Sequence, residues 1–172
     1  LVSNLGHNQA IFKGDEVIAF YTSEEQEEVD FDAYEIIEYN GDCITIEHTW
    51  DIFSKNGAAI REDFEYLTED RKSQPIPKSV NVIAPEFIFI EEGAKLEFVT
   101  LNASTGPIYI GRDAEIMEGS TIRGPFALCD DASVKMGSKV YGATTVGPHS
   151  RIGGEVKNAV LFANSNKGHE GY

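Results

Sequence analysis

Aliphatic residues recur at every sixth position through the second half of the chain. Eight consecutive members of this series are aliphatic: Ile110, Ile116, Ile122, Leu128, Val134, Val140, Val146 and Ile152. The fourth residue after each is mostly small: Ala114, Ser120, Ala132, Ser138, Thr144 and Ser150 follow this rule, whereas Phe126 and Val156 do not. A period of six fits neither an amphipathic helix nor the alternation of an ordinary strand.

This repeat is typical of a left-handed parallel β-helix, in which three hexads form one triangular coil. The aliphatic side chain points inward and stacks on its equivalent in the next coil, and the small residue lies near a corner. The hexads of residues 110–157 make about 2.7 coils. Ile90 and Leu96 have the same spacing in another phase, so we expect a further coil to begin near Val82. Residues 102–107 interrupt the phase, which predicts an insertion at a corner.

The pattern of the first 75 residues predicts mixed α and β structure. Residues 10–21 are typical of a β-hairpin with its turn at residues 13–16, and residues 43–47 alternate like another strand. Thr49 is a candidate N-cap for a helix. After it, apolar residues recur at helical spacing: Trp50, Phe53, Ile60, Phe64 and Leu67.

A composition change marks a domain boundary between residues 75 and 76. Pro75 and Pro77 enforce extended backbone and stop any helix. Residues 1–75 carry 18 acidic and 5 basic side chains, whereas residues 76–172 carry 11 and 9. We therefore expect an α/β segment over 1–75 and the β-helix over 76–172. The acidic run at residues 23–32 is expected to be a solvated loop or helix face, because it lacks the ligand spacing of a calcium loop.

The net charge of −15 limits the classes of partner that the protein is expected to bind. It excludes a nucleic-acid binder that works by neutralising phosphates, and it disfavours docking on anionic membranes. No apolar run approaches the length of a membrane span. Two cysteines, Cys43 and Cys129, fit a reducing compartment and indicate a cytoplasmic protein. Residues 132–172 differ from the rest, since five bases and two acids give them a net charge of +3.

The β-helix alone does not define a function, because acyltransferases, γ-class carbonic anhydrases and non-catalytic scaffold proteins all use it. A carbonic anhydrase needs a cluster of histidine ligands. His149 and His169 are the histidines of this half and no third one completes a site, so no metal site is predicted. His149 follows Gly147 and Pro148 and is expected to be a surface turn residue.

The end of the chain carries a more specific pattern. A Glu155-x-Lys157 pair is followed by His169 twelve residues after the lysine and by Tyr172 three residues further on. This stretch resembles the acetyltransferase half of the bifunctional N-acetylglucosamine-1-phosphate uridyltransferase and glucosamine-1-phosphate acetyltransferase family. The resemblance to a diverged branch of sugar nucleotidyltransferases is closer still, and it covers nearly the whole chain. The strings that carry this similarity are residues 50–54, 71–75, 102–107 and 165–169.

The resemblance implies a role for each of these residues. His169 would be the general base of an acetyl transfer, since a neutral imidazole can take a proton from an amine. Lys157 would pair with the sugar phosphate, Glu155 would bind a sugar hydroxyl or the substrate amine, and Tyr172 would contribute a phenolic hydrogen bond. Acetyl-CoA would be the acyl donor, and Mg²⁺ would serve the nucleotidyltransferase half. The implied assembly is a homotrimer with the active site between subunits.

The resemblance implies acetyl-CoA-dependent N-acetylation of glucosamine 1-phosphate, nucleotidyl transfer to a sugar 1-phosphate, or both. The alternative is a non-catalytic hexapeptide-repeat protein that assembles or binds sugar phosphate. The family's phosphate-binding arginine, one coil earlier, is replaced by Tyr141 as the nearest residue. In that family the acetyl-CoA groove lies in coils beyond the tyrosine. The family's nucleotide-binding loop has no counterpart in this sequence. We therefore expect a truncated β-helix after the C-terminal part of a nucleotidyltransferase-like domain, with no acetyltransferase activity in residues 1–172 alone.

Overall fold

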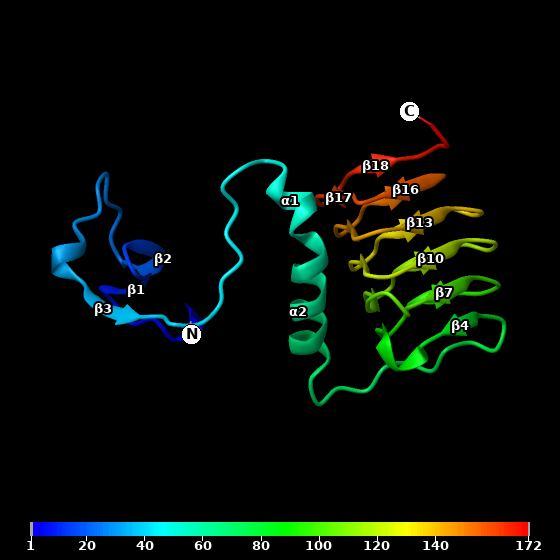
Figure 1. Ribbon diagram of the computed structural model, residues 1–172, viewed down its shortest axis with the longest axis horizontal. Helices are drawn as coiled ribbons and strands as arrows, with labels where there is room; N and C mark the ends of the chain where they lie inside the picture. The colour runs from blue at the N-terminus through cyan, green and yellow to red at the C-terminus, as the bar shows by residue number, and fades with distance from the viewer. Residues whose placement is uncertain (1, 172) are drawn as a thin grey trace. The chain divides into compact units, whose positions relative to one another are not determined.

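The computed structural model describes residues 2–171, which form two compact units, Leu1–Cys43 and Ile44–Tyr172 (Figure 1). The predicted boundary between residues 75 and 76 lies inside the second unit, in the segment between its long helix and its first coil.

The first unit is a small three-stranded sheet. Strands β1 (Gln9–Lys13) and β2 (Glu16–Tyr21) form the predicted antiparallel hairpin, and β3 (Glu35–Glu38) pairs with β1 in parallel. Two short 3₁₀ helices, η1 (Val2–Asn4) and η2 (Phe31–Ala33), complete the unit. Edge-to-face contacts join Phe31 to Phe12 and Phe20, so an aromatic cluster supplies much of the apolar packing.

Two predictions for the N-terminal half have different outcomes. The prediction of a strand at residues 43–47 is wrong, because no strand forms there and the third strand is β3 instead. The sequence of β3 does not alternate, since Ile36 and Ile37 are adjacent, and an edge strand needs no alternation to pair. The acidic run at residues 23–32 forms an exposed loop that ends in η2, as expected.

The predicted helix is present but is interrupted at Lys55. It consists of α1 (Asp51–Ser54) and α2 (Asn56–Thr68). Thr49 is not its N-cap. Instead, the Asp51 carboxylate accepts hydrogen bonds of 3.0 Å from the backbone N–H groups of Glu47 and His48, which holds the chain at the start of α1. Trp50 is 56% exposed, so the apolar helical pattern does not mark a buried face along its whole length.

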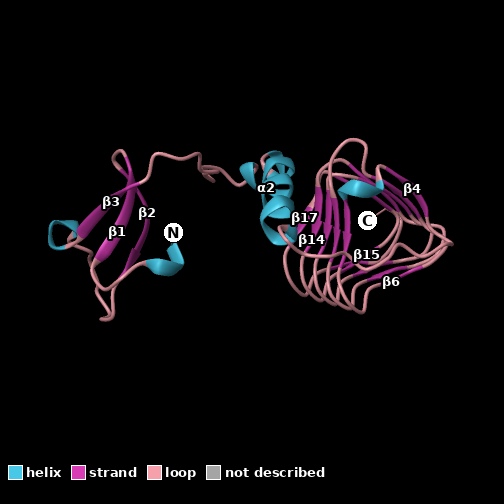
Figure 2. Ribbon diagram, turned by 90° about the horizontal axis from the view of Figure 1, so that it is seen from below, coloured by secondary structure: helices cyan, strands magenta, loops and turns pink. Residues whose placement is uncertain are grey.

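The rest of the second unit is a left-handed parallel β-helix with three five-stranded parallel sheets, which confirms the predicted fold (Figures 1 and 2). The first sheet contains β4 (Asn81–Ile83), β7 (Thr100–Asn102), β10 (Thr121–Arg123), β13 (Lys139–Tyr141) and β16 (Glu155–Lys157). The second contains β5 (Ile88–Ile90), β8 (Ile108–Ile110), β11 (Phe126–Leu128), β14 (Thr144–Val146) and β17 (Val160–Leu161). The third contains β6 (Lys95–Leu96), β9 (Glu115–Ile116), β12 (Ser133–Val134), β15 (Arg151–Ile152) and β18 (Asn166–Lys167). A 3₁₀ helix, η3 (Pro85–Phe87), joins β4 to β5.

The interior of the β-helix is the predicted aliphatic ladder. All eight residues of the six-residue series are at most 1% exposed, and the six small residues that follow them are equally buried. A coil begins at β4 as expected near Val82, and residues 103–107 form the predicted insertion between β7 and β8. The last coil is shorter than the others. Val134 pairs with Ile152, eighteen positions later, whereas Ile152 pairs with Lys167, only fifteen positions later.

The corners of the coils require left-handed backbone. At the corner between the second and third sheets, Asp113, Asp131, His149 and Asn164 all have φ between 54° and 59°. Asp and Asn tolerate this region, which explains why they recur at this corner. His149 is an exposed turn residue, as predicted, and its Nδ1 lies 3.6 Å from the carboxylate of Asp131.

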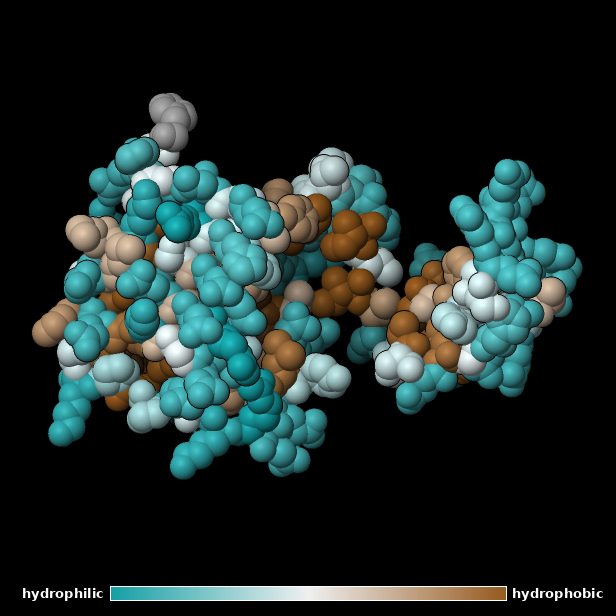
Figure 3. All heavy atoms as spheres, turned by 180° about the vertical axis from the view of Figure 1, so that it is seen from behind, coloured by the Kyte–Doolittle hydropathy of each residue, from teal (hydrophilic) through white to brown (hydrophobic). Residues whose placement is uncertain are grey.

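Helix α2 covers part of the second sheet beside β14 (Figure 2). The guanidinium of Arg61 donates a hydrogen bond of 2.9 Å to the carbonyl of Thr105, so the insertion between β7 and β8 also holds the helix. In the face shown in Figure 3, hydrophilic side chains cover most of the β-helix and separate smaller hydrophobic groups. Among residues 2–171, no helix is both long and apolar enough to cross a membrane. The cytoplasmic location stays a prediction.

Candidate functional site

Glu155 and Lys157 lie side by side on the outer surface of the first sheet. Both belong to β16, and Val156 between them points into the core. The two-residue spacing therefore places both charged side chains on the same exposed face of the strand.

Tyr141 on the neighbouring strand β13 joins these two residues. Its hydroxyl donates a hydrogen bond to the carboxylate of Glu155, and the ammonium of Lys157 lies 5.5 Å from its ring centroid. The hydrogen bond to Glu155 raises the pKa of the Tyr141 phenol above its ordinary value. In the sequence, Tyr141 stood out only as the residue nearest to the position of the family's phosphate-binding arginine. The structure makes it the centre of a cluster of a carboxylate, a phenol and an ammonium.

His169 lies at the corner that follows β18 and is exposed. It lines a pocket of about 370 Å³ together with Lys135, Gly153, Gly154 and Glu170. Its imidazole makes no hydrogen bond or ion pair with any other residue between 2 and 171. The predicted site residues are therefore not one hydrogen-bonded constellation.

The loop that carries His169 nevertheless packs next to the Glu155 strand. A Cβ atom added at Gly154 would lie 2.6 Å from the Cα of Glu170, and Gly154 has a φ of +75°, so this corner requires glycine. The Glu170 carboxylate accepts a 3.0 Å hydrogen bond from the ammonium of Lys139, whose register partner is Glu155. This ion pair, through that hydrogen bond, raises the pKa of Lys139. We call Tyr141, Glu155, Lys157 and His169 the corner site. Tyr172, the fourth residue of the predicted site, lies outside the described residues.

A second cluster, formed by Arg71, Glu91 and Tyr109, has a structural role. Buried Glu91 accepts hydrogen bonds of 2.7 Å from the Arg71 guanidinium and 2.6 Å from the Tyr109 hydroxyl. Next to it, the hydroxyl of Ser73 accepts a bond from the backbone N–H of Ile90. The bonds of Arg71 and Ser73 fasten the segment after α2 to the first coil, and the Tyr109 bond joins the second coil to the first. No signal in the sequence distinguished this cluster from other charged residues.

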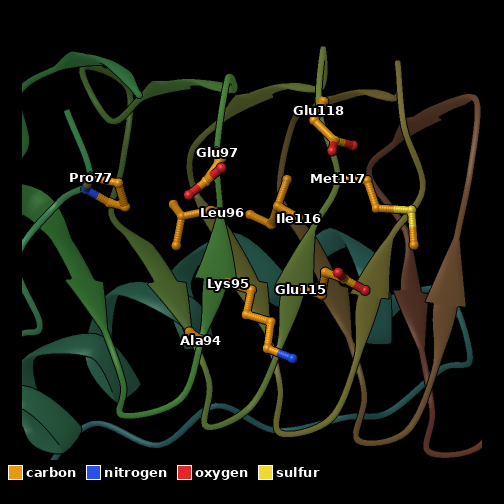
Figure 4. Close-up of a pocket in the computed structure, with 9 residues that line it drawn as sticks. All are labelled: Pro77, Ala94, Lys95, Leu96, Glu97, Glu115, Ile116, Met117 and Glu118. Atoms are coloured by element: carbon orange, nitrogen blue, oxygen red, sulfur yellow. The ribbon is translucent and has the colours of Figure 1, made fainter. Parts of the chain in front are cut away.

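Another pocket, of about 380 Å³, lies on the third sheet near the start of the β-helix (Figure 4). Pro77 and Met117 contribute to its apolar wall. Its charged side chains are one base, Lys95, and three acids, Glu97, Glu115 and Glu118. Three acids against one base repel phosphate. A phosphorylated ligand therefore fits the corner site better than this pocket.

No three His, Cys, Asp or Glu side chains within residues 2–171 gather in a way that could hold a metal ion. The described residues therefore offer no cluster of three protein ligands for Mg²⁺.

Comparison with models of protein families gives a match to the N-terminal part of the chain. Residues 1–72 match a family described as sugar nucleotidyl transferase. No curated protein and no solved structure matches the chain. The match covers the first unit and both helices, ends close to the predicted boundary at residue 75, and includes no strand of the β-helix. It supports a link to sugar nucleotidyl transferases, and hence to transferases, without identifying the bifunctional uridyltransferase and acetyltransferase family.

Proposed function

We propose that the chain is part of a sugar-phosphate transferase of nucleotide-sugar synthesis, and that its β-helix binds the sugar phosphate at the corner site. The family match over residues 1–72 supports the transferase class. The observation that carries the site is the grouping of Tyr141, Glu155 and Lys157 on two paired strands beside the His169 corner. Such convergence of polar groups is what recognition of a polar small molecule requires.

The corner site supplies groups for each part of an amino-sugar phosphate. The Glu155 carboxylate can accept hydrogen bonds from sugar hydroxyls or from the amine, and Tyr141 holds that carboxylate in place. Lys157 adds a positive charge on the first sheet, which favours the approach of an anionic ligand. The surrounding residues 132–172 are basic in an otherwise acidic protein, so they attract an anionic ligand. Tyr172 is proposed to add a further hydrogen bond.

The finer proposal is acetyl transfer to the amine of glucosamine 1-phosphate. The amine nitrogen attacks the thioester carbonyl carbon of acetyl-CoA, the carbon–sulfur bond breaks so that CoA leaves as its thiolate, and the proton lost by nitrogen goes to the imidazole of His169. The exposed position of His169 at the rim of a pocket allows a substrate amine to approach it. Nucleotidyl transfer to a sugar 1-phosphate is the second reaction proposed for the protein.

Three parts of the proposal concern more than the described residues. We propose that residues other than 2–171 bind acetyl-CoA next to the corner site. We also propose that residues other than 2–171 hold any Mg²⁺ that nucleotidyl transfer needs. We also propose a cytoplasmic homotrimer, because the resemblance implies a site between subunits.

Two assays on the protein produced from its natural gene test the proposal. The first follows CoA thiol release from acetyl-CoA and glucosamine 1-phosphate, and the second follows pyrophosphate release from UTP and N-acetylglucosamine 1-phosphate. His169→Ala should abolish the first activity and leave the second intact. His149→Asn is the matched control, because it removes another exposed histidine at a corner that tolerates asparagine.

The outcomes separate the two classes of function. Thiol release that His169→Ala leaves unchanged contradicts the role of His169. Absence of both activities, together with binding of glucosamine 1-phosphate, would favour the alternative of a non-catalytic sugar-phosphate-binding protein.

A further inference from the structure

Lys135 reaches from the third coil to the loop that carries His169. It follows β12, and the backbones of Gly153 and Gly168 lie above it at the same corner. Its ammonium donates a hydrogen bond of 3.3 Å to the carbonyl of Gly168. A Cβ atom added at Gly153 would lie 3.3 Å from the Lys135 Cδ and 3.0 Å from the Gly168 oxygen. Because glycine has no side chain, Gly153 and Gly168 leave room for the side chain of Lys135 along the corner.

The positive charge of Lys135 has no counter-ion within residues 2–171. The ammonium lies on a half-buried side chain, and its hydrogen bond goes to a neutral carbonyl. Glu170, the acidic residue that lines the same pocket, already pairs with Lys139 at 3.0 Å. A partly desolvated ammonium without an anion is costly, so a bound anion would be favourable here.

Lys167 brings a second ammonium to the same loop. It occupies a position of the interior ladder that Leu96, Ile116, Val134 and Ile152 fill in the four preceding coils. Its ammonium donates hydrogen bonds of 2.8 Å to the carbonyl of Gly153 and 2.7 Å to that of His169. Places where a sequence breaks its own packing pattern tend to be functional. Lys167 thus fixes the turn that presents His169 and adds positive potential beneath it.

We propose that Lys135 binds the anionic phosphate group of the ligand in the pocket that His169 lines, with Lys167 as a positioning residue for that loop. This inference rests on the proposed function and names a binding residue that the resemblance does not assign. Lys157, which the resemblance assigns to the phosphate, lies over Tyr141 on the first sheet and does not line this pocket. Lys135 is the cation that lines the pocket together with His169, so a phosphate bound beside His169 would lie within the same pocket as its ammonium.

NMR titration of the 172-residue chain tests the inference. Inorganic phosphate and glucosamine 1-phosphate should each shift the imidazole resonances of His169 and leave those of His7 and His48 in place. Lys135→Met should weaken both affinities about tenfold or more, since it removes a charge-assisted hydrogen bond. Gly153→Ala should weaken them as well, because its methyl group obstructs the path of Lys135 while the charge is kept.

Lys95→Met is the matched control. Lys95 is an exposed lysine on the first coil of the third sheet, so its removal changes the net charge equally. Unchanged His7, His48 and His149 resonances in each variant show that the fold is retained. An affinity loss in Lys135→Met no larger than in Lys95→Met overturns the inference, as does absence of any phosphate effect on His169. Phosphate binding that depends on Lys135, together with absence of both activities in the two assays described above, would instead overturn the proposed function alone.

Discussion

The hydroxyl of Thr145 donates a hydrogen bond of 2.8 Å to the side-chain oxygen of Asn56, 89 positions earlier in the chain. The amide nitrogen of Asn56 donates in turn to the carbonyl of Ala143 at 3.0 Å. Asn56 is the first residue of α2, and Thr145 lies on β14 of the second sheet. Both polar ends of one buried side chain therefore fasten the helix to the fourth coil. This attachment explains why the helix belongs to the same compact unit as the β-helix.

Asn56→Ala should destabilise the second unit. The substitution leaves the Thr145 hydroxyl and the Ala143 carbonyl without their partner, which costs about 1–3 kcal/mol for partly buried polar groups. Fluorescence of Trp50, the single tryptophan, reports on unfolding next to α1 in a urea titration. Asn81→Ala removes an exposed asparagine and should change the free energy of unfolding by much less. Equal effects of the two variants would contradict the attachment.

Shortening an interior side chain should reduce the free energy of unfolding less at the end of the β-helix than at its centre. Val82, Leu101, Ile122 and Val140 stack in register, yet Val82 is 36% exposed and Ile122 is fully buried. Ile122→Ala should lower the free energy of unfolding by about 2–5 kcal/mol because it leaves a cavity. Val82→Ala should lower the free energy of unfolding by much less than Ile122→Ala does, since solvent already reaches Val82. Urea unfolding of both variants measures the difference, and a cost at Val82 equal to that at Ile122 would refute the closed ladder.

The Tyr109–Glu91 hydrogen bond should make stability sensitive to alkali. Burial and the neighbouring Glu91 carboxylate raise the pKa of Tyr109 to about 12. A group with a raised folded-state pKa stabilises the fold fully below its unfolded pKa, near 10 for tyrosine, and loses that contribution as the pH rises towards 12. The free energy of unfolding should therefore fall between pH 10 and 12.

Tyr109→Phe should be less stable than the wild type at pH 8, and the difference should shrink as the pH approaches 12. Tyr66→Phe is the control, because Tyr66 is 79% exposed and its removal should leave the pH profile unchanged. Burial opposes ionisation of Glu91, but hydrogen bonds from Tyr109 and Arg71 outweigh it and lower the pKa of Glu91. The same cluster should therefore also lose stability in acid, as Glu91 is protonated below its ordinary pKa of 4.5.

The six-residue repeat predicted the β-helix because each coil must place an equivalent side chain in the same interior position. The prediction works from Ile110 to Ile152, where stacked residues of the second and third sheets lie eighteen positions apart. It stops at the last coil, which has only fifteen positions between Ile152 and Lys167. Counting by six would not have identified Lys167 as an interior residue.

The Glu155-x-Lys157 pair was noticed through the resemblance, and the structure places both side chains on one face of β16, since alternation decides which side each residue occupies. Lys135 could not be found in this way. Its position depends on two glycines that stand above it in later coils, and only the stacking brings residues 135, 153 and 168 together. The strand predicted at residues 43–47 does not form, because local alternation of apolar and polar residues is not by itself enough to make a strand.

The assembly can be tested by light scattering on the purified chain. If the chain forms the proposed homotrimer, the measured mass should be three times the 18.9 kDa of one chain. Exposed apolar side chains on the β-helix, including Phe98, Met136 and Phe162, give such an assembly surface to bury. A monomer at high concentration would count against a site between subunits.

The corner site makes a last prediction about Tyr141 and Glu155. Because the hydrogen bond to the Glu155 carboxylate is the main cause of the raised phenol pKa of Tyr141, Glu155→Gln should lower that pKa towards its ordinary value of 10. NMR titration of the Tyr141 ring resonances follows the change. Glu118→Gln, which removes an exposed carboxylate elsewhere on the β-helix, should not affect it. Glu155→Gln should also weaken binding of glucosamine 1-phosphate more than Tyr141→Phe does, since the phenylalanine keeps the ring beneath Lys157 and the carboxylate that faces the ligand. If Glu155→Gln changes neither the titration of Tyr141 nor the affinity, the two residues do not act as one recognition unit.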